Sequence, residues 1–173
     1  MKIRIKIFLF IVISTLLSSC FIGAGTHGSL KGYKYPTTKD KLDSAVMLVI
    51  KNNPNIYRDT NNVNYIIDQT NGKNDTIIDN YYNDGINYLT IKIKTEKGQN
   101  EYTFRYYGGE EDWKTAATSE IFICYAYDEF GKGGSEGNGG VDSKTLKHLT
   151  EVFERELVSN IDKQLNLTHI ETE

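Results

Sequence analysis

Apolar residues recur with two different periods along this chain, and the change of period constrains the fold more than any other feature. Near both ends of the region 37–167 the spacing is three or four residues, which is typical of amphipathic helices. Between these ends the spacing is two, which is typical of strands with one buried face. Strands grouped between two helices predict an α+β fold.

The first helix is predicted over residues 38–52. Thr37 or Thr38 can cap its start, and Asn52-Asn53-Pro54 ends it, because a proline disfavours helix at the residue before it. The apolar stripe consists of Leu42, Ala45, Val46, Val49 and Ile50. This spacing puts one face of the helix against a core.

A longer helix is predicted from about Asp142 to Leu165. Its apolar residues recur at steps of three and four, and they are Leu146, Leu149, Phe153, Leu157, Ile161 and Leu165. Burying each of the larger side chains contributes roughly 1.5–3 kcal/mol. We therefore expect this helix to be a main source of stability.

Strands are predicted over residues 63–68, 76–79, 88–94, 102–107 and 120–127. The third has Leu89, Ile91 and Ile93 on one face and polar residues on the other, and the last is apolar on both faces. The prediction is an antiparallel meander sheet of four to five strands. The N-terminal and the C-terminal helix should both pack on one face of it.

The first nineteen residues have the pattern of a secretory signal peptide. Three cations lie within the first six residues, and residues 7–17 are apolar apart from Ser14 and Thr15. This apolar run is about half of the roughly 20 residues with which a helix spans a bilayer. We expect residues 1–19 to be removed, and not to persist as a transmembrane anchor.

The signal ends in Leu17-Ser18-Ser19-Cys20, which resembles the lipobox of bacterial lipoproteins. The resemblance implies that the Cys20 thiol receives a diacylglycerol and that Cys20 becomes the first residue of the mature chain. Residues 21–36 contain four glycines and no apolar period, so we expect the lipidated cysteine and a flexible tether over 20–36. A single domain over 37–167 and a short tail over 168–173 should follow.

The net charge of the chain limits the classes of partner that it can bind. The signal contains three of the 20 Lys and Arg residues, so the mature chain has 17 against 23 acidic residues, a formal charge of −6. We expect contact with the membrane through the lipid on Cys20, since no basic cluster follows it, and no binding of nucleic acid. After Cys20 there is neither an acidic surface-export stretch nor an inner-membrane retention Asp, so the resemblance implies the outer membrane and a domain that faces the periplasm.

Two groups of residues could carry chemistry, but neither has the context that a catalytic motif needs. Glu110, Glu111 and Asp112 are three neighbouring carboxylates, which could bind a cation or form an acid–base pair. We interpret them as acids in the first turn of a short helix at about 110–117. Ser135 falls in a Gly-x-Ser-x-Gly pattern, but within the glycine-rich segment 131–140, which we interpret as a mobile connection.

The histidines and the second cysteine predict no metal or redox site. His27, His148 and His169 do not form a spaced pair, and no cofactor motif occurs. With Cys20 lipidated, Cys124 has no intrachain partner, and its apolar surroundings indicate a small buried side chain. We predict no catalytic residue, no metal and no cofactor.

Aromatic residues suggest a binding surface. Side chains with an apolar body and a polar tip suit the binding of peptides or sugars. The candidate patch consists of Tyr106, Tyr107, Trp113, Tyr125 and Tyr127. These aromatics equally suit the interior of a sheet.

The expectation is a membrane-anchored lipoprotein that works by binding a protein or a glycan. An immunity lipoprotein against a delivered toxin is the alternative within this class. The alternative from another class is an envelope hydrolase that uses Glu110, Glu111 or Asp112. Converging carboxylates in a deep pocket would favour the hydrolase.

Overall fold

The computed structural model describes residues 30–58, 64–68, 75–79, 85, 87–135 and 141–172. The expected signal peptide, Cys20 and residues 21–29 of the expected tether lie outside these ranges. Within them, no helix combines the length and the apolar composition that crossing a membrane requires.

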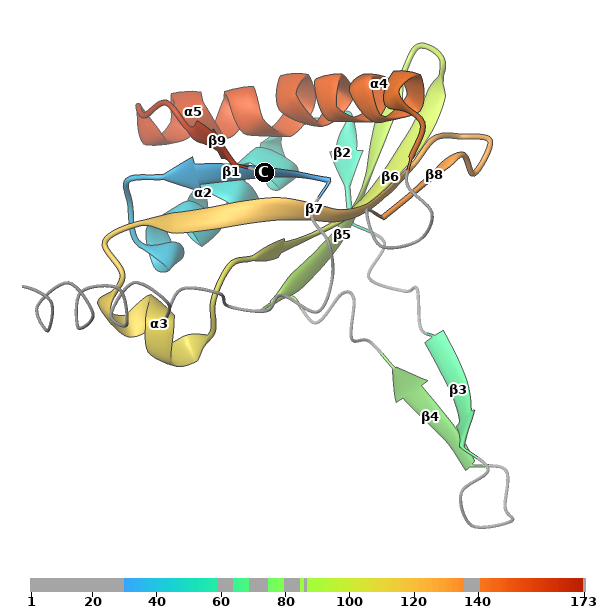
Figure 1. Cartoon of the computed structure of the whole chain (residues 1–173), viewed down its shortest axis with the longest axis horizontal. Coiled ribbons are helices and arrows are strands. Elements are labelled where there is room, and N and C mark those ends of the chain that lie inside the picture. The colour runs from blue at the N-terminus through green and yellow to red at the C-terminus, as the bar shows by residue number, and fades with distance from the viewer. Residues whose placement is uncertain are drawn as a thin grey trace, which may run out of the picture.

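A seven-stranded antiparallel sheet forms the body of the described chain (Figure 1). Six strands follow one another in the order β2-β5-β6-β7-β1-β9, and β8 pairs with β7. Their bounds are β1 Lys31–Tyr35, β2 Ile56–Tyr57, β5 Tyr88–Thr95, β6 Gly98–Tyr106, β7 Ser119–Tyr127, β8 Gly133–Gly134 and β9 Ile170–Thr172. The α+β prediction is confirmed, with more strands than the expected four to five.

The sheet is not a simple meander, because both ends of the domain take part in it. β1 pairs with β7, and β9 pairs with the other side of β1. Residues 31–35 were expected in the tether and residues 170–172 in the tail, so both assignments are wrong. The cause is side-chain alternation: Tyr33 and Tyr35 are completely buried on the helix side of the sheet.

Gly32 is where β9 packs most closely on β1. A Cβ atom at this position would lie 2.1 Å from Oγ1 of Thr172. The glycines before residue 36 therefore do not all belong to a tether. At this glycine, an added Cβ would collide with the side chains of Thr172 and Glu120 unless they moved.

The glycine-rich segment is also partly ordered. Gly133 pairs with Tyr127 and Gly134 with Ala126, so residues 133–134 are a strand and not a mobile connection. A Cβ atom on Gly133 would meet the carbonyl oxygen of Ala126 at 1.9 Å. Residues 136–140 of the segment lie outside the described ranges.

A second, two-stranded sheet consists of β3 (Asn64–Asp68) and β4 (Asp75–Asp79). Asn64 pairs with Asp79 at one end and Asp68 with Asp75 at the other. The strands predicted over residues 63–68 and 76–79 are confirmed within the described residues. The two-stranded sheet does not extend the main sheet, however, so these two strands are not part of the meander.

The first helix, α2, spans Lys39–Asn52 and buries the five stripe residues predicted for it. Thr38 is its N-cap residue, but the threonine side chain makes no capping hydrogen bond. Ser44 instead donates to the carbonyl of Asp40 at 2.8 Å within the helix. The extent of the helix is confirmed, and the capping role of the threonine is wrong.

The long C-terminal helix contains a π-helical turn. It consists of α4 (Ser143–Phe153), the π turn η2 (Glu154–Val158) and α5 (Ser159–Leu165). From Leu149 onward the apolar residues are spaced by four, and on a regular α-helix this spacing would rotate the stripe by about 160° over sixteen residues. The π turn takes up one extra residue, and Leu157 and Ile161 therefore stay completely buried.

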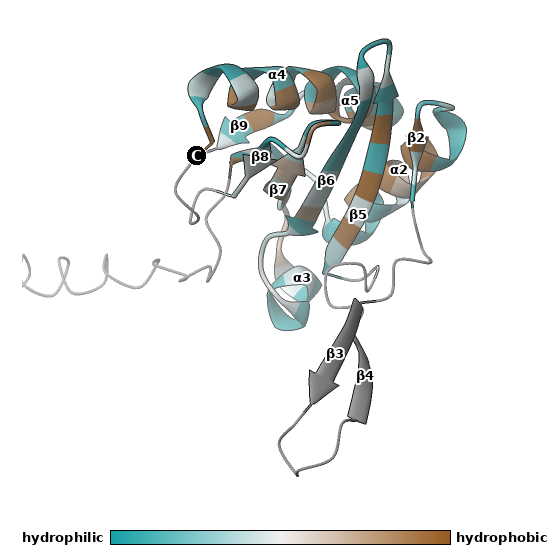
Figure 2. Cartoon of the chain, turned by 90° about the vertical axis from the view of Figure 1, so that its right-hand side faces the viewer, coloured by the Kyte–Doolittle hydropathy of each residue, from teal (hydrophilic) through white to brown (hydrophobic). Residues whose placement is uncertain are grey.

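One apolar core lies between the helices and the sheet. Its cluster joins residues of α2, α4, η2 and α5 to the inward residues of β1, β5, β6 and β7. Along β5 and α4, brown and teal segments alternate, as expected for elements with one buried face (Figure 2). The prediction that both terminal helices pack on one face of the sheet is confirmed.

Candidate functional site

The predicted aromatic patch is not a single surface. The Tyr106 side chain is completely buried, and its hydroxyl donates to Oδ1 of Asp43 at 2.7 Å. Burial is the main reason why the pKa of Tyr106 is raised, and the Asp43 carboxylate adds to the shift. This residue belongs to the core and cannot contact a partner, so its assignment to the patch is wrong.

The remaining four aromatics divide into two pairs. Tyr107 is 54% exposed, and its carbonyl accepts a hydrogen bond from the indole nitrogen of Trp113 at 2.8 Å. Tyr107 lies beside Glu120 on β7, whereas Tyr125 is five residues further along that strand, about 17 Å away. Tyr125 and Tyr127 therefore belong to the other end of the strand.

The three neighbouring carboxylates begin a helix, as predicted. The helix α3 spans Glu110–Thr115, and Asp112 accepts a hydrogen bond from the backbone N–H of Gly109 at 2.9 Å. Glu111 forms an ion pair with Lys114 at 2.6 Å. Asp112 and Glu111 therefore have structural roles in the exposed first turn of this helix.

The remaining residues that could carry chemistry, which are Ser135, Cys124 and the histidines, do not form one site. Ser135 is only 6% exposed and directly follows β8. Cys124 is completely buried, and burial raises the pKa of its thiol to about 12, against the opposing effect of Arg105. Nδ1 of His169 lies 2.9 Å from Oδ2 of Asp162, whereas His148 belongs to α4. Within the described ranges no three His, Cys, Asp or Glu side chains cluster as metal ligands.

The π turn forms a polar junction between the C-terminal helix and the end of α2. The carbonyl of Glu156, which lies within the π turn, accepts hydrogen bonds from side chains. Side-chain amides of Asn53 and Asn160 donate to it at 3.0 and 2.8 Å. The end of α2 is thereby held against the π turn.

The carboxylate of Glu156 completes this junction. It accepts hydrogen bonds from Arg155 at 2.8 Å and from Asn55 at 3.3 Å. Burial by itself would raise the pKa of Glu156, but the hydrogen bonds from Arg155, Asn55 and Asn53 outweigh burial and lower it. The group is a carboxylate at neutral pH, which suits a structural acceptor and not a proton donor.

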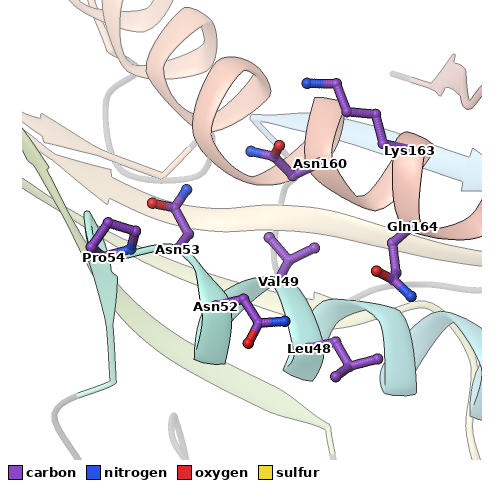
Figure 3. Close-up of a pocket in the computed structure, with 8 residues that line it drawn as sticks. All are labelled: Leu48, Val49, Asn52, Asn53, Pro54, Asn160, Lys163 and Gln164. Atoms are coloured by element: carbon purple, nitrogen blue, oxygen red, sulfur yellow. The ribbon is translucent and has the colours of Figure 1, made fainter.

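A groove of about 500 Å³ opens beside this junction, between α2 and α5. Its lining comes from both helices and from the turn after α2, and it consists of Leu48, Val49, Asn52, Asn53, Pro54, Asn160, Lys163 and Gln164. Figure 3 shows Val49 pointing into the space between the helices and Gln164 reaching from α5 toward α2. Four of the eight residues carry a primary amide, which both donates and accepts hydrogen bonds.

A second hollow, of about 720 Å³, lies on the other side of the junction. It is lined by the turn between β5 and β6 and by α4 and η2. Lys94, Lys97 and Arg155 face Glu96, Glu151 and Glu156 there, together with His148. The basic and acidic groups balance, so this hollow offers no preference for a ligand of either charge.

The amide groove was not among the sequence predictions. Asn52-Asn53-Pro54 was interpreted only as the end of a helix, and no role was predicted for Asn160 or Gln164. Nothing in a linear sequence indicates that two polar faces more than one hundred residues apart meet. The available signal was the number of asparagines at the end of α2, which exceeds what a helix stop needs.

Comparison of the chain with protein-family models, with curated proteins and with solved structures finds no match in any of the three. The features of this chain that bear on function are therefore the groove and the N-terminal sequence.

Proposed function

We propose that this chain is a lipid-anchored protein of the bacterial cell envelope whose folded domain works by binding a partner. The groove between α2 and α5 is the observation that supports binding. It combines apolar side chains with amides that can donate and accept, and a binding site for a ligand with both apolar and polar groups needs this combination. Lys163 is the one charged residue in its lining.

The same observation weighs against the envelope hydrolase. A hydrolase needs a nucleophile or a water-activating base in contact with its substrate. The groove lining contains neither a carboxylate nor a serine, cysteine or histidine. In the second hollow, Glu156 is held ionised by its hydrogen bonds.

The anchor is proposed from the sequence Leu17-Ser18-Ser19-Cys20. Two or more acyl chains on one cysteine would hold the domain firmly on a membrane. The absence of an Asp directly after Cys20 supports the outer membrane, and the absence of an acidic stretch supports a domain that faces the periplasm. Partners within reach there are other envelope proteins and glycans. An immunity protein against a delivered toxin is one form that such binding could take.

The two cysteines provide a matched test of the anchor. Cys20→Ala should abolish the incorporation of labelled palmitate in cells, and the protein should leave the detergent phase. Cys124→Ala should retain the label, because the Cys124 side chain is completely buried and inaccessible to an acyltransferase. Label that persists in Cys20→Ala would refute the lipoprotein assignment.

Binding can be tested by photocrosslinking in living cells. We would place the photoreactive amino acid p-benzoylphenylalanine at Leu48, which is 41% exposed and lines the groove. Phe130, which is 78% exposed and lies outside the groove, provides the control position. A discrete adduct at position 48 and not at position 130 is expected. No adduct at 48, or the same products from both positions, would contradict binding through this groove.

A further inference from the structure

The groove between α2 and α5 continues into a second depression along the same two helices. This depression of about 370 Å³ shares Leu48 and Gln164 with the groove and extends to Asp40 at the start of α2. We call the two together the α2–α5 trough. It follows α2, whose fourteen residues measure about 21 Å, and an extended peptide of about six residues has the same length.

Hydrogen-bonding groups along the trough are available to a ligand. Within the described part of the chain, the side-chain amides of Asn52 and Gln164 have no hydrogen-bond partner. Asn160 donates to the π turn at 2.8 Å, which leaves its amide oxygen as an acceptor. A primary amide presents a carbonyl and an N–H side by side, as a peptide unit does, so the two can pair.

The floor of the trough is aliphatic. Val49 and Ala45 are almost fully buried, and Leu48 and Leu165 complete the apolar lining. No aromatic side chain lines either depression, so the trough lacks the flat rings on which sugars commonly stack. Aliphatic side chains of a peptide fit this floor better than a glycan does.

The charge of the rim favours an acidic ligand. Lys41 and Lys163 line the trough, and neither forms an ion pair within the described ranges. Asp40 is the one acidic residue in its lining, which leaves the rim with a net positive charge on a chain of net charge −3. A carboxylate on the ligand would be attracted to this rim.

We propose that the α2–α5 trough binds an extended peptide segment of another protein, with aliphatic side chains on Leu48 and Val49 and an acidic side chain near Lys163. This inference rests on the proposed binding function and identifies its ligand class. Backbone amides of the peptide pair with Asn52 and Gln164, which gives affinity without a fixed sequence. The aliphatic floor and the basic rim give the preference.

The test begins with a phage-displayed library of random dodecapeptides, selected on the full chain purified in mild detergent. Enriched peptides are synthesised, and their Kd is measured by fluorescence polarisation. We expect aliphatic residues at alternate positions together with at least one Asp or Glu. Maltohexaose serves as the oligosaccharide probe in the same assay.

Two pairs of variants locate the site. Leu48 and Met47 are neighbours on α2 with 41% and 39% exposure, but Leu48 alone lines the trough. Leu48→Gln should weaken peptide binding about tenfold, as the loss of an interface anchor does, whereas Met47→Gln should leave the Kd unchanged. Lys163→Glu should weaken binding, whereas Lys144→Glu, at an exposed site outside the trough, should not.

Four results would overturn the inference. Peptides that bind all four variants equally would place their site elsewhere. Maltohexaose that binds in a Leu48-dependent way, without enrichment of peptides, would make the trough a glycan site. If the photocrosslink at position 48 forms but no peptide is enriched, the peptide class is wrong and the binding function remains. If neither occurs, both proposals fail.

Discussion

Replacing Phe153 by alanine should remove a large part of the stability of the domain. The Phe153 side chain is completely buried at the centre of the core. Its ring centroid lies 5.2 Å from that of Tyr102, 5.6 Å from that of Phe104 and 5.8 Å from that of Tyr33. The substitution therefore opens a cavity between α4 and the strands β1 and β6.

The expected loss follows from this environment. Buried Phe→Ala changes cost about 3–5 kcal/mol, and packing against several rings places this site in the upper half of that range. We expect a decrease of about 4 kcal/mol in the free energy of unfolding, against a total of about 5–15 kcal/mol for a natural domain. At a urea dependence of about 2 kcal/mol per M, the unfolding midpoint should fall by about 2 M.

Urea unfolding followed by circular dichroism measures this difference. Phe130→Ala is the matched control, because it makes the same chemical change at a side chain that is 78% exposed. Its midpoint should stay within about 0.25 M of that of the unmodified chain. If the two variants unfold at the same urea concentration, the core is not packed around Phe153 as described.

Further tests address the C-terminal helix, the turn at β8, the buried thiol and the excluded catalytic residues. Leu157→Asp should unfold the domain, whereas Lys147→Asp should change the free energy of unfolding by no more than about 1 kcal/mol, and equal melting temperatures would contradict the orientation of the helix. Gly133→Ala should destabilise far more than Gly131→Ala, since a Cβ meets a backbone carbonyl at the first position and nothing within 4 Å at the second; equal thermal unfolding would refute the pairing of β8. The Cys124 thiol has a pKa of about 12 in the folded chain and near 9 in the unfolded chain. The free energy of unfolding should therefore fall as pH rises from 9 to 12. Urea midpoints should show a less steep fall for Cys124→Ala. Alanine variants of four residues should each complement a deletion strain, and these residues are Glu110, Glu111, Asp112 and Ser135. A folded variant that fails to complement would favour the hydrolase.

The periodic elements of this fold could be predicted from the sequence, because local side-chain patterns specify them. The stripe of α2 was predicted residue by residue, and so was the inward face of β5. The acids of α3 were also correctly interpreted as the start of a helix. Each of these patterns repeats within a few residues, so a local reading suffices.

The short strands were missed because their stability comes from distant parts of the chain. β9 has three residues, and β1 contains a glycine and two lysines, so neither has a strong strand pattern. β1 is a strand because β7 and β9 flank it and because two tyrosines cover the core. The aromatic patch failed for a different reason: side chains alternate along β6, which puts Tyr106 inside and Tyr107 outside.

The sequence by itself determined the α+β class, the two terminal helices and the expectation of a lipid anchor at Cys20. Only the tertiary structure decided where a ligand could bind. Asn52 and Gln164 are polar residues on two separate helices, and nothing in either helix distinguishes them from an ordinary solvated face. They line one trough because the π turn at Glu156 and the amide of Asn53 hold α2 beside α5, a contact between residues 103 positions apart.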